Sequence, residues 1–289
     1  MVPVGPGDRA EPGEEHVIEG GAEHEVQRGE RLAPVVTDQG VLDGLAGRLP
    51  GRVVLPGRPL RRARARFRPA ALQLAGAVGE SRHPAQQVEA YIGYLAPSSY
   101  ITNAAAFSTA DLLRRVTTVA YRTRELQLNR PESGAGTAER ATWQDDPAWQ
   151  PARKAIEYAL VSYDWGEAFT ALNLVLGPTL DDVLLTRLGE VARANGDHLT
   201  WLLTTYLAAD SQRRAKWSRA LADLAVTQRP ANRAVLGKWI DRWSPRADEA
   251  AQAVGTLFEA LPERGMAASE VAAHARAARM RFLAGLVTA

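Results

Sequence analysis

The chain has 289 residues, of which 46% are hydrophobic and 24% charged, and its formal net charge is +2. These values are ordinary for a globular protein of one large or two smaller domains, and so small a net charge does not by itself indicate nucleic-acid binding. Because the chain has no cysteine, disulfides, thiolate nucleophiles, iron–sulfur clusters and cysteine-ligated zinc are excluded.

The sequence shows no features of a secretory signal and no apolar run near the roughly 20 residues that span a membrane. We therefore expect a cytoplasmic protein with no membrane partner.

Residues 1–85 differ in composition from the rest of the chain. Phe67 is the only aromatic residue before Tyr91, and about half of the glycines and prolines lie here. A segment with so few large apolar groups cannot offset its ordering entropy by burial. We expect residues 1–85 to be poorly structured, or to be translated from a wrong start or reading frame, and residues 86–289 to form the folded domain.

Two features of this first segment have a functional interpretation. The arginines of residues 61–66 are typical either of a basic arm for nucleic acid or an acidic partner, or of a solvated tail, and we favour the tail. Glu80 and His83 have the Glu-x-x-His spacing of a diiron ligand pair, but Pro84 follows at once and disfavours a helix there. One such pair without its companion helices is not expected to bind metal.

From residue 86 onward, apolar residues recur at helical spacing. A short helix is predicted over residues 86–95 and a longer one over residues 103–128, whose arginines we expect on a solvated or ion-paired face: Arg114, Arg115, Arg122 and Arg124. Asp146 and Pro147 are typical of an N-cap and a first helical position. The helix that they begin is predicted to run to Leu176 and to end at Gly177 and Pro178.

The remaining elements are also predicted to be helical. Thr179 and Asp182 have capping-box spacing, and residues 195–197 predict a helix end followed by a new N-cap, with His198 in a solvent-facing first turn. Further helices are predicted over residues 199–226, around 235–243 with Pro245 as a break, and over 247–261 and 270–287. No strand alternation, phosphate-binding glycine loop, Gly-x-Ser-x-Gly motif or zinc spacing competes, so the fold class is all-α and bundle-like.

The stretch from residue 163 to residue 175 is the centre of this pattern. Two apolar stripes lie on the same predicted helix, so we expect it to be buried against more than one neighbour. Asp164 and Glu167 lie three residues apart within it, and Glu157 lies one heptad before Asp164. Buried carboxylates must be ion-paired, hydrogen-bonded or metal-bound, and the function depends on which of these holds.

Several motifs occur in order over residues 86–262: Tyr91-Ile92-Gly93-Tyr94-Leu95-Ala96, Ala120-Tyr121-Arg122-Thr123, Asp146-Pro147-Ala148-Trp149-Gln150-Pro151, Tyr163-Asp164-Trp165-Gly166-Glu167-Ala168-Phe169 and Ala194-Asn195-Gly196-Asp197. Together they resemble the small (β) hydroxylase subunit of bacterial multicomponent diiron monooxygenases, of the toluene, alkene and propane type. The resemblance does not extend to residues 1–85.

The resemblance implies a ferritin-like helical bundle with additional helices. It implies a cytoplasmic hetero-oligomer that hydroxylates or epoxidises small hydrocarbons, in which an α subunit holds the diiron centre, usually beside a γ subunit. A reductase with FAD and a 2Fe-2S cluster would deliver electrons from NADH, and a small effector protein would tune the reaction. It also implies that this chain carries no catalytic, cofactor-binding or metal-binding residue of its own.

The residues themselves allow a test of that last implication. A diiron bundle takes a Glu from each of two helices and a Glu-x-x-His from each of two others. If Phe169 and Thr170 correspond to a similar pair in the α subunit, the downstream Glu-x-x-His falls at positions 210–213 or 211–214. Both registers end on arginine, which has no lone pair to donate and stays cationic. The residues expected in a salt-bridged core in place of a metal site are Asp164, Glu167, Asp210, Arg213 and Arg214.

All seven tryptophans of the chain lie after residue 140. Four of these residues are candidates for a large obligate interface with partner subunits, the alternative for about half of them being the core: Trp143, Trp149, Trp239 and Trp243. The alternative functions are a stand-alone helical metal-binding or interaction protein and a nucleic-acid-binding protein that uses the arginine arm. For the metal-binding alternative the sequence shows no ligand set.

Overall fold

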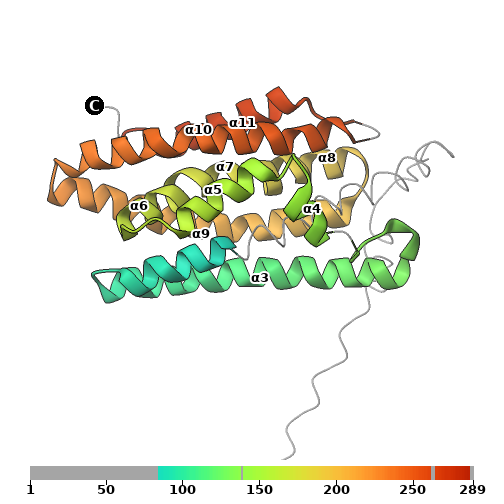
Figure 1. Ribbon diagram of the computed structural model, residues 1–289, viewed down its shortest axis with the longest axis horizontal. Helices are drawn as coiled ribbons and strands as arrows, with labels where there is room; N and C mark the ends of the chain where they lie inside the picture. The colour runs from blue at the N-terminus through green and yellow to red at the C-terminus, as the bar shows by residue number, and fades with distance from the viewer. Residues whose placement is uncertain (1–83, 138, 262–263, 287–289) are drawn as a thin grey trace, which may run out of the picture. The chain divides into compact units, whose positions relative to one another are not determined.

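The computed structural model describes residues 84–137, 139–261 and 264–286. The arginine stretch of residues 61–66 and the Glu80–His83 pair lie outside these residues. Every regular element in the described part of the chain is a helix, which confirms the all-α prediction (Figure 1).

The helices follow one another through short connections. The first covers residues 84–95, and α3 (Ser99–Asn129), the 3-10 turn η1 (Pro131–Ser133), α4 (Glu139–Asp145) and α5 (Gln150–Leu160) come next. A continuous helical segment is then built from α6 (Trp165–Phe169), η2 (Thr170–Leu176), α7 (Gly177–Asp181), η3 (Asp182–Arg187) and α8 (Leu188–Ala194), in which η2 and η3 are π-helices. The last three helices are α9 (His198–Gln228), α10 (Asn232–Glu259) and α11 (Ala268–Leu283).

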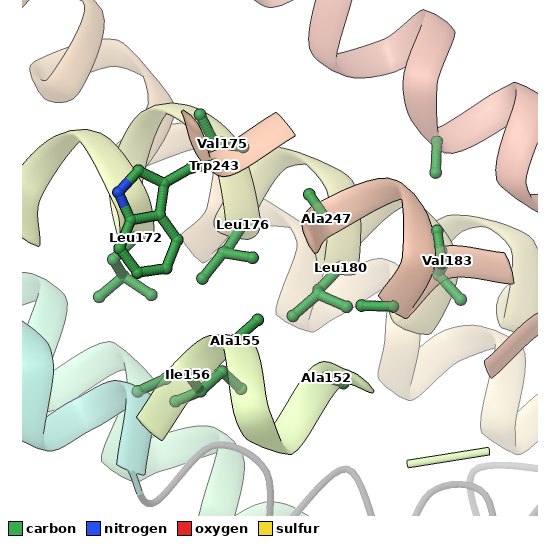
Figure 2. Close-up of a cluster of buried hydrophobic side chains, with 14 of the residues drawn as sticks. Ala152, Ala155, Ile156, Leu172, Val175, Leu176, Leu180, Val183, Trp243 and Ala247 are labelled. Carbon is green, nitrogen blue, oxygen red and sulfur yellow. The ribbon is translucent and has the colours of Figure 1, made fainter. Parts of the chain in front are cut away.

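The helical segment from α6 to α8 forms the centre of the hydrophobic core. Its side chains pack between α5 and α10, and α11 covers α10 and α7. Figure 2 shows part of this core, with Ala152, Ala155 and Ile156 from α5, Leu172, Val175, Leu176, Leu180 and Val183 from the central segment, and Trp243 and Ala247 from α10. Each fully buried leucine or isoleucine contributes about 1.5–3 kcal/mol, so burial on two sides stabilises this apolar segment within the fold.

The same segment, Trp165–Ala194, is long and apolar enough to cross a membrane by length and composition alone. The expectation that no stretch of the chain meets this test was therefore wrong. However, 94% of its most apolar window is buried inside the protein, so packing within the fold accounts for its apolar character.

The predicted helix from residue 147 to Leu176 is two helices in the structure. The chain leaves the helical path after Leu160 and starts again at Trp165, because the Asp164 carboxylate accepts hydrogen bonds from the backbone N–H groups of Gly166 at 2.7 Å and Glu167 at 3.3 Å. These are two of the donors that a helix start leaves without intrahelical partners. Asp164 is thus an exposed N-cap, and the expectation that it lies in a buried carboxylate row was wrong.

Gly177 and Pro178 do not end the helix, which is a second correction. The Gly177 N–H donates to the Leu172 carbonyl five residues earlier, which makes a wider π-turn. The wider turn accommodates the proline ring and its missing N–H, which in a regular α-helix would clash with a carbonyl and leave it without a donor. Pro245 is likewise inside α10 rather than at a break, since Trp243 and Ala247 on either side of it are buried.

The turn before α9 follows the prediction. α8 ends at Ala194, Gly196 has φ +76°, and the Asp197 carboxylate caps α9 by accepting from the Thr200 N–H at 3.1 Å. Glycine is favoured in that left-handed conformation because it has no Cβ to clash. His198 is exposed in the first turn, as expected.

Candidate functional site

The interior between α3, α7 and α9 holds a buried ion-pair centre around Asp181. Arg115 on α3 donates to Asp181 Oδ1 at 3.0 Å, and Arg214 on α9 donates to Oδ2. Ser211 on α9 donates to the same Oδ2 at 2.7 Å and accepts from Arg115 at 2.8 Å. All three charged side chains are at least nine-tenths buried. An uncompensated charge is very costly in such a site. These ion pairs therefore fix the positions of α3, α7 and α9 relative to one another.

Gly177 allows Arg214 to reach this centre. A Cβ at residue 177 would lie 2.9 Å from Arg214 Nη2 and 2.7 Å from the Leu172 carbonyl oxygen. The guanidinium therefore lies directly against the backbone of the central helix. The two π-helices flank this point, and such π-segments often occur at functional sites.

A buried carboxyl group on the first described helix lies near Arg214. Glu89 is fully buried and accepts a hydrogen bond from Asn173 Nδ2 at 2.9 Å. Burial raises its pKa to about 7, although the positive charge of Arg214 and the Asn173 hydrogen bond oppose that rise. Within the described residues, neither Glu89 Oε1 nor Asn173 Oδ1 has a hydrogen-bond partner.

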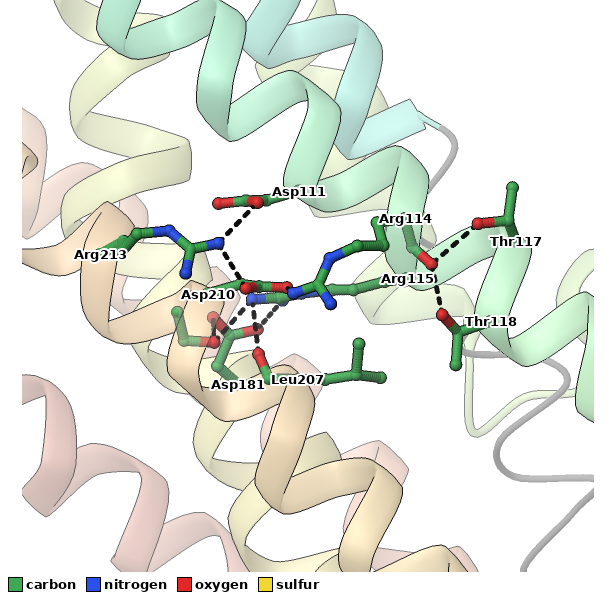
Figure 3. Close-up of polar contacts among 10 residues, drawn as sticks. Asp111, Arg114, Arg115, Thr117, Thr118, Asp181, Leu207, Asp210 and Arg213 are labelled. Atoms are coloured by element: carbon green, nitrogen blue, oxygen red, sulfur yellow. Dashed lines mark hydrogen bonds and ion pairs between the residues drawn. The ribbon is translucent and has the colours of Figure 1, made fainter. Parts of the chain in front are cut away.

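A second ion-pair cluster lies closer to the surface, between α3 and α9. Asp210 is buried and binds both Arg114 and Arg213, and Arg213 also binds Asp111 at 2.7 Å. Figure 3 shows Arg213 between Asp111 and Asp210, with Arg115 and Asp181 beside them. The Arg114 guanidinium lies 4.6 Å from the centre of the Tyr206 ring, a cation–π distance. Hydrogen bonding to Asp210 raises the pKa of Arg114.

The two candidate ligand pairs predicted from the sequence, at positions 210 and 213 and at positions 211 and 214, therefore lie in two different clusters. Asp210 and Arg213 face α3 in the outer cluster, whereas Ser211 and Arg214 face α7 in the inner one. Asp210 meets Arg213 as expected, at 2.5 Å, but Arg214 binds Asp181 instead.

Glu167 lies apart from both clusters. It accepts hydrogen bonds from Arg242 at 2.8 Å and from Trp243 Nε1 at 3.2 Å, which join α6 to α10. The expected single core of Asp164, Glu167 and Asp210 is thus three separate sites: a helix cap, a link between α6 and α10, and the outer cluster.

The residues that complete the inner centre are not among those predicted from the sequence: Glu89, Arg115, Asn173 and Asp181. Arg115 is ion-paired, as one of the two expected alternatives had it, but it is buried, with 2% exposure. The predicted capping box of Thr179 and Asp182 was wrong, because α7 and η3 continue through these residues. The available signal was a charged residue within each apolar helical stripe, which requires a partner if the helix is buried.

The donor set of these clusters does not fit iron. Within residues 84–286, apart from the gaps at 138 and 262–263, no group of three or more His, Cys, Asp and Glu side chains is placed to hold a metal ion. The carboxylate of Asp181 is engaged by two guanidinium groups, whose positive charges would repel a cation.

Three of the four tryptophans predicted as interface candidates are buried within the chain itself. Trp143, Trp149 and Trp243 are in the core, and Trp239 is half-buried against it. Of the two alternatives drawn from the sequence, interface or core, the burial of these three side chains favours the core.

A pocket of about 230 Å³ reaches the inner centre from the surface between α9 and α11. Asn173, Asp181, Ser211 and Arg214 line its inner part, and Gln212 and Phe282 are among the residues that line the rest of it. Polar groups of the centre thus meet a space large enough for several water molecules.

The fold and this centre define a class of protein: a ferritin-like helical bundle whose interior carries arginine–carboxylate pairs. Residues 60–229 match the model of the family described as methane/phenol/alkene hydroxylase. Because the match covers more than half of the chain, the chain belongs to this family.

Relatives of known identity agree with this assignment. The β subunit of the hydroxylase component of the toluene-4-monooxygenase system of Ectopseudomonas mendocina is 42% identical over 171 residues, which are 59% of this chain and 52% of the relative. The small subunit of the hydroxylase component of propane 2-monooxygenase of Gordonia sp. (strain TY-5) is 27% identical over 185 residues, 63% of this chain and 50% of the relative. The resemblance to small hydroxylase subunits drawn from the motifs is thereby confirmed.

Two solved structures have the same fold. A chain of toluene 4-monooxygenase with toluene bound in its resting active site has a TM-score of 0.65 and 34% identity, with 76% of this chain and 69% of that chain covered. A chain of xenon-pressurised phenol hydroxylase from Pseudomonas sp. OX1 has a TM-score of 0.63 and 24% identity, with 75% and 63% covered. The chain spans about half the length of the curated relatives it matches.

Proposed function

We propose that this chain is the non-catalytic β subunit of the hydroxylase component of a multicomponent diiron monooxygenase. It binds an α subunit that carries the iron, and it serves as a scaffold for the hydroxylation or epoxidation of a small hydrocarbon in the cytoplasm. A γ subunit, a small effector protein and an NADH-dependent reductase with FAD and a 2Fe-2S cluster complete the system.

One observation carries this proposal. Arg214 occupies the position where one register of a diiron bundle would have histidine, and its guanidinium binds the buried Asp181 carboxylate. In the other register Arg213 binds Asp210. Since arginine supplies five N–H donors and no acceptor, these pairs stabilise the bundle interior in the way that bound metal would, without redox chemistry.

The relatives support the same assignment. Their names describe β or small subunits of hydroxylase components that act on toluene and propane. The burial of the apolar helix inside the fold is consistent with a cytoplasmic assembly.

The test is metal analysis of the purified chain, alone and after co-expression with the α subunit of the same organism. We expect iron to follow the α subunit, and the isolated chain to hold no stoichiometric iron after anaerobic incubation with ferrous salt. Two irons bound per isolated chain would overturn the proposal. A chain that never co-purifies with the α subunit would also contradict it.

A further inference from the structure

A pocket of about 260 Å³ lies between the start of α6, the last turns of α9 and the first turns of α10. The buried side chains that line it form its floor: Phe169, Ala222 and Leu236. The half-buried apolar side chains form its walls: Trp165, Leu221 and Trp239. None of these six side chains is charged and three are aromatic, so the interior favours an apolar ligand with a ring.

Two contacts hold the aromatic lining in place. A Cβ at Gly166 would lie 3.2 Å from Cζ3 and Cη2 of Trp239, so the six-membered ring of this indole lies directly against the start of α6. The centre of the Phe169 ring lies 5.5 Å from that of Trp217, whose Nε1 donates to Ser108 Oγ at 2.8 Å. Binding sites for small molecules are usually pre-formed in this way.

The mouth of the pocket is polar. Asp164 is exposed and Asn232 is half-buried, and both line the pocket. Asp164 Oδ1 accepts the two N–H groups of the helix start, and Asn232 Nδ2 donates to the Ala225 carbonyl at 2.9 Å. Within the described residues, Asp164 Oδ2 and Asn232 Oδ1 have no hydrogen-bond partner. Two acceptor oxygens are therefore available at the mouth.

The walls add hydrogen-bond donors. The Nε1–H groups of Trp217 and Trp243 are bound to Ser108 and Glu167. Those of Trp165 and Trp239 have no acceptor in the part of the chain that the structure describes. A buried indole N–H usually has a partner, so the two half-buried wall tryptophans can each donate to a ligand.

This combination of donors and acceptors selects one kind of polar group. A hydroxyl group both donates and accepts, whereas an ammonium group only donates and a carboxylate only accepts. A carboxylate would also be repelled by the charge of Asp164. An apolar cavity of about 150 Å³ is enough to hold benzene, so this larger pocket has room for one ring with a small substituent.

We propose that this pocket binds a small, neutral aromatic compound with one hydroxyl group. The ring lies against Trp165 and Trp239, and the hydroxyl group faces the free oxygens of Asp164 and Asn232. The inference concerns residues of this chain alone and does not depend on the proposed function.

The test uses the full-length chain and follows the binding of phenol by ligand-observed NMR. We expect a dissociation constant on the order of 1 mM, in the range for a ligand of so few atoms. Benzene has the same ring without the hydroxyl group and should bind about tenfold more weakly. Benzylammonium and benzoate should also bind more weakly than phenol. Equal or tighter binding of any of these three would overturn the proposed ligand class.

A substitution that fills the pocket tests its location. Ala225→Phe places a ring in the pocket and should weaken phenol binding at least about tenfold. Ala220→Phe, at an exposed alanine of the same helix outside the pocket, is the matched control and should bind phenol like the wild type. Circular dichroism checks that each variant folds. Val235→Trp, at the mouth and 43% exposed, is a second filling variant with the same expectation.

A charge substitution tests the orientation of the ligand. Asp164→Asn keeps a good helix cap and removes the negative charge at the mouth. We expect it to bind benzoate at least about fivefold more tightly than the wild type does, with little change for phenol. No binding of phenol to the wild-type chain, or wild-type binding by both filling variants, would show that the site is wrong. Unchanged binding of benzoate by Asp164→Asn would contradict the placement of the hydroxyl group.

Discussion

Arg115 and Arg214 share one carboxylate. The first comes from α3 and the second from α9, and they bind opposite oxygens of Asp181 on α7. Both guanidinium groups lie in the interior, so the negative charge of Asp181 stabilises two buried cations at once. This relationship explains how a bundle interior can be polar and still stable.

The first prediction concerns Asp181. Replacing it by Asn leaves two buried guanidinium groups without their shared anion, so we expect the free energy of unfolding to fall by about 3–5 kcal/mol. Urea denaturation at pH 7 measures this change. Glu157→Gln, which breaks the exposed Arg153–Glu157 pair, is the control and should have a small effect. An equally small effect of Asp181→Asn would contradict the buried ion-pair centre.

The second prediction separates two adjacent arginines. Arg214 is 5% exposed and Arg213 is 59% exposed, although both stand at candidate ligand positions in the sequence. Arg214→Ala should destabilise the chain by several kcal/mol, about as much as breaking other buried pairs. Arg213→Ala should cost much less, because the Arg213 side chain is itself exposed and Arg114 still pairs with the buried Asp210 carboxylate. Thermal or urea unfolding of the two variants side by side tests the difference, and equal losses would argue against the two-cluster arrangement.

The third prediction is a pH dependence that originates at Glu89. Its pKa is about 7 in the folded chain against an ordinary value of 4.5, so the native state binds the proton more tightly than the unfolded state does. The resulting stabilisation is fully present below pH 4.5 and is lost as the pH rises through 7. This loss is on the order of 3 kcal/mol.

Glu89→Gln keeps the shape and removes the titration. We expect the variant to match the wild type near pH 4.5 and to be the more stable protein at pH 8, with stability curves that diverge between these values. Urea unfolding at intervals of half a pH unit measures both curves. Parallel curves would show that Glu89 does not titrate in this range.

The fourth prediction concerns Gly177. Alanine is the better helix former by roughly 1 kcal/mol, yet its Cβ would meet Arg214 and the Leu172 carbonyl at less than 3 Å. We therefore expect Gly177→Ala to lower the free energy of unfolding by about 1–3 kcal/mol, in the range of overpacked sites. A stabilised variant would mean that the guanidinium does not lie against the helix there.

The sequence by itself determined the helical character of the described chain, the turn at Asn195–Asp197, and the presence of arginine in both candidate ligand registers. Each of these depends on residues within about four positions of one another, where helical periodicity and capping operate. The motifs were likewise sufficient to indicate the hydroxylase family.

Only the tertiary structure decided which charges meet. The bonds of the inner centre join residues 33, 66 and 96 positions apart, and no local pattern shows that Asp181 and Arg115 are buried and bind one another. It also placed three tryptophans in the core and left Tyr100, Phe107 and Tyr121 of α3 exposed. The physical reason is that burial and ion pairing depend on how distant helices pack, whereas helix formation can be inferred from neighbouring residues.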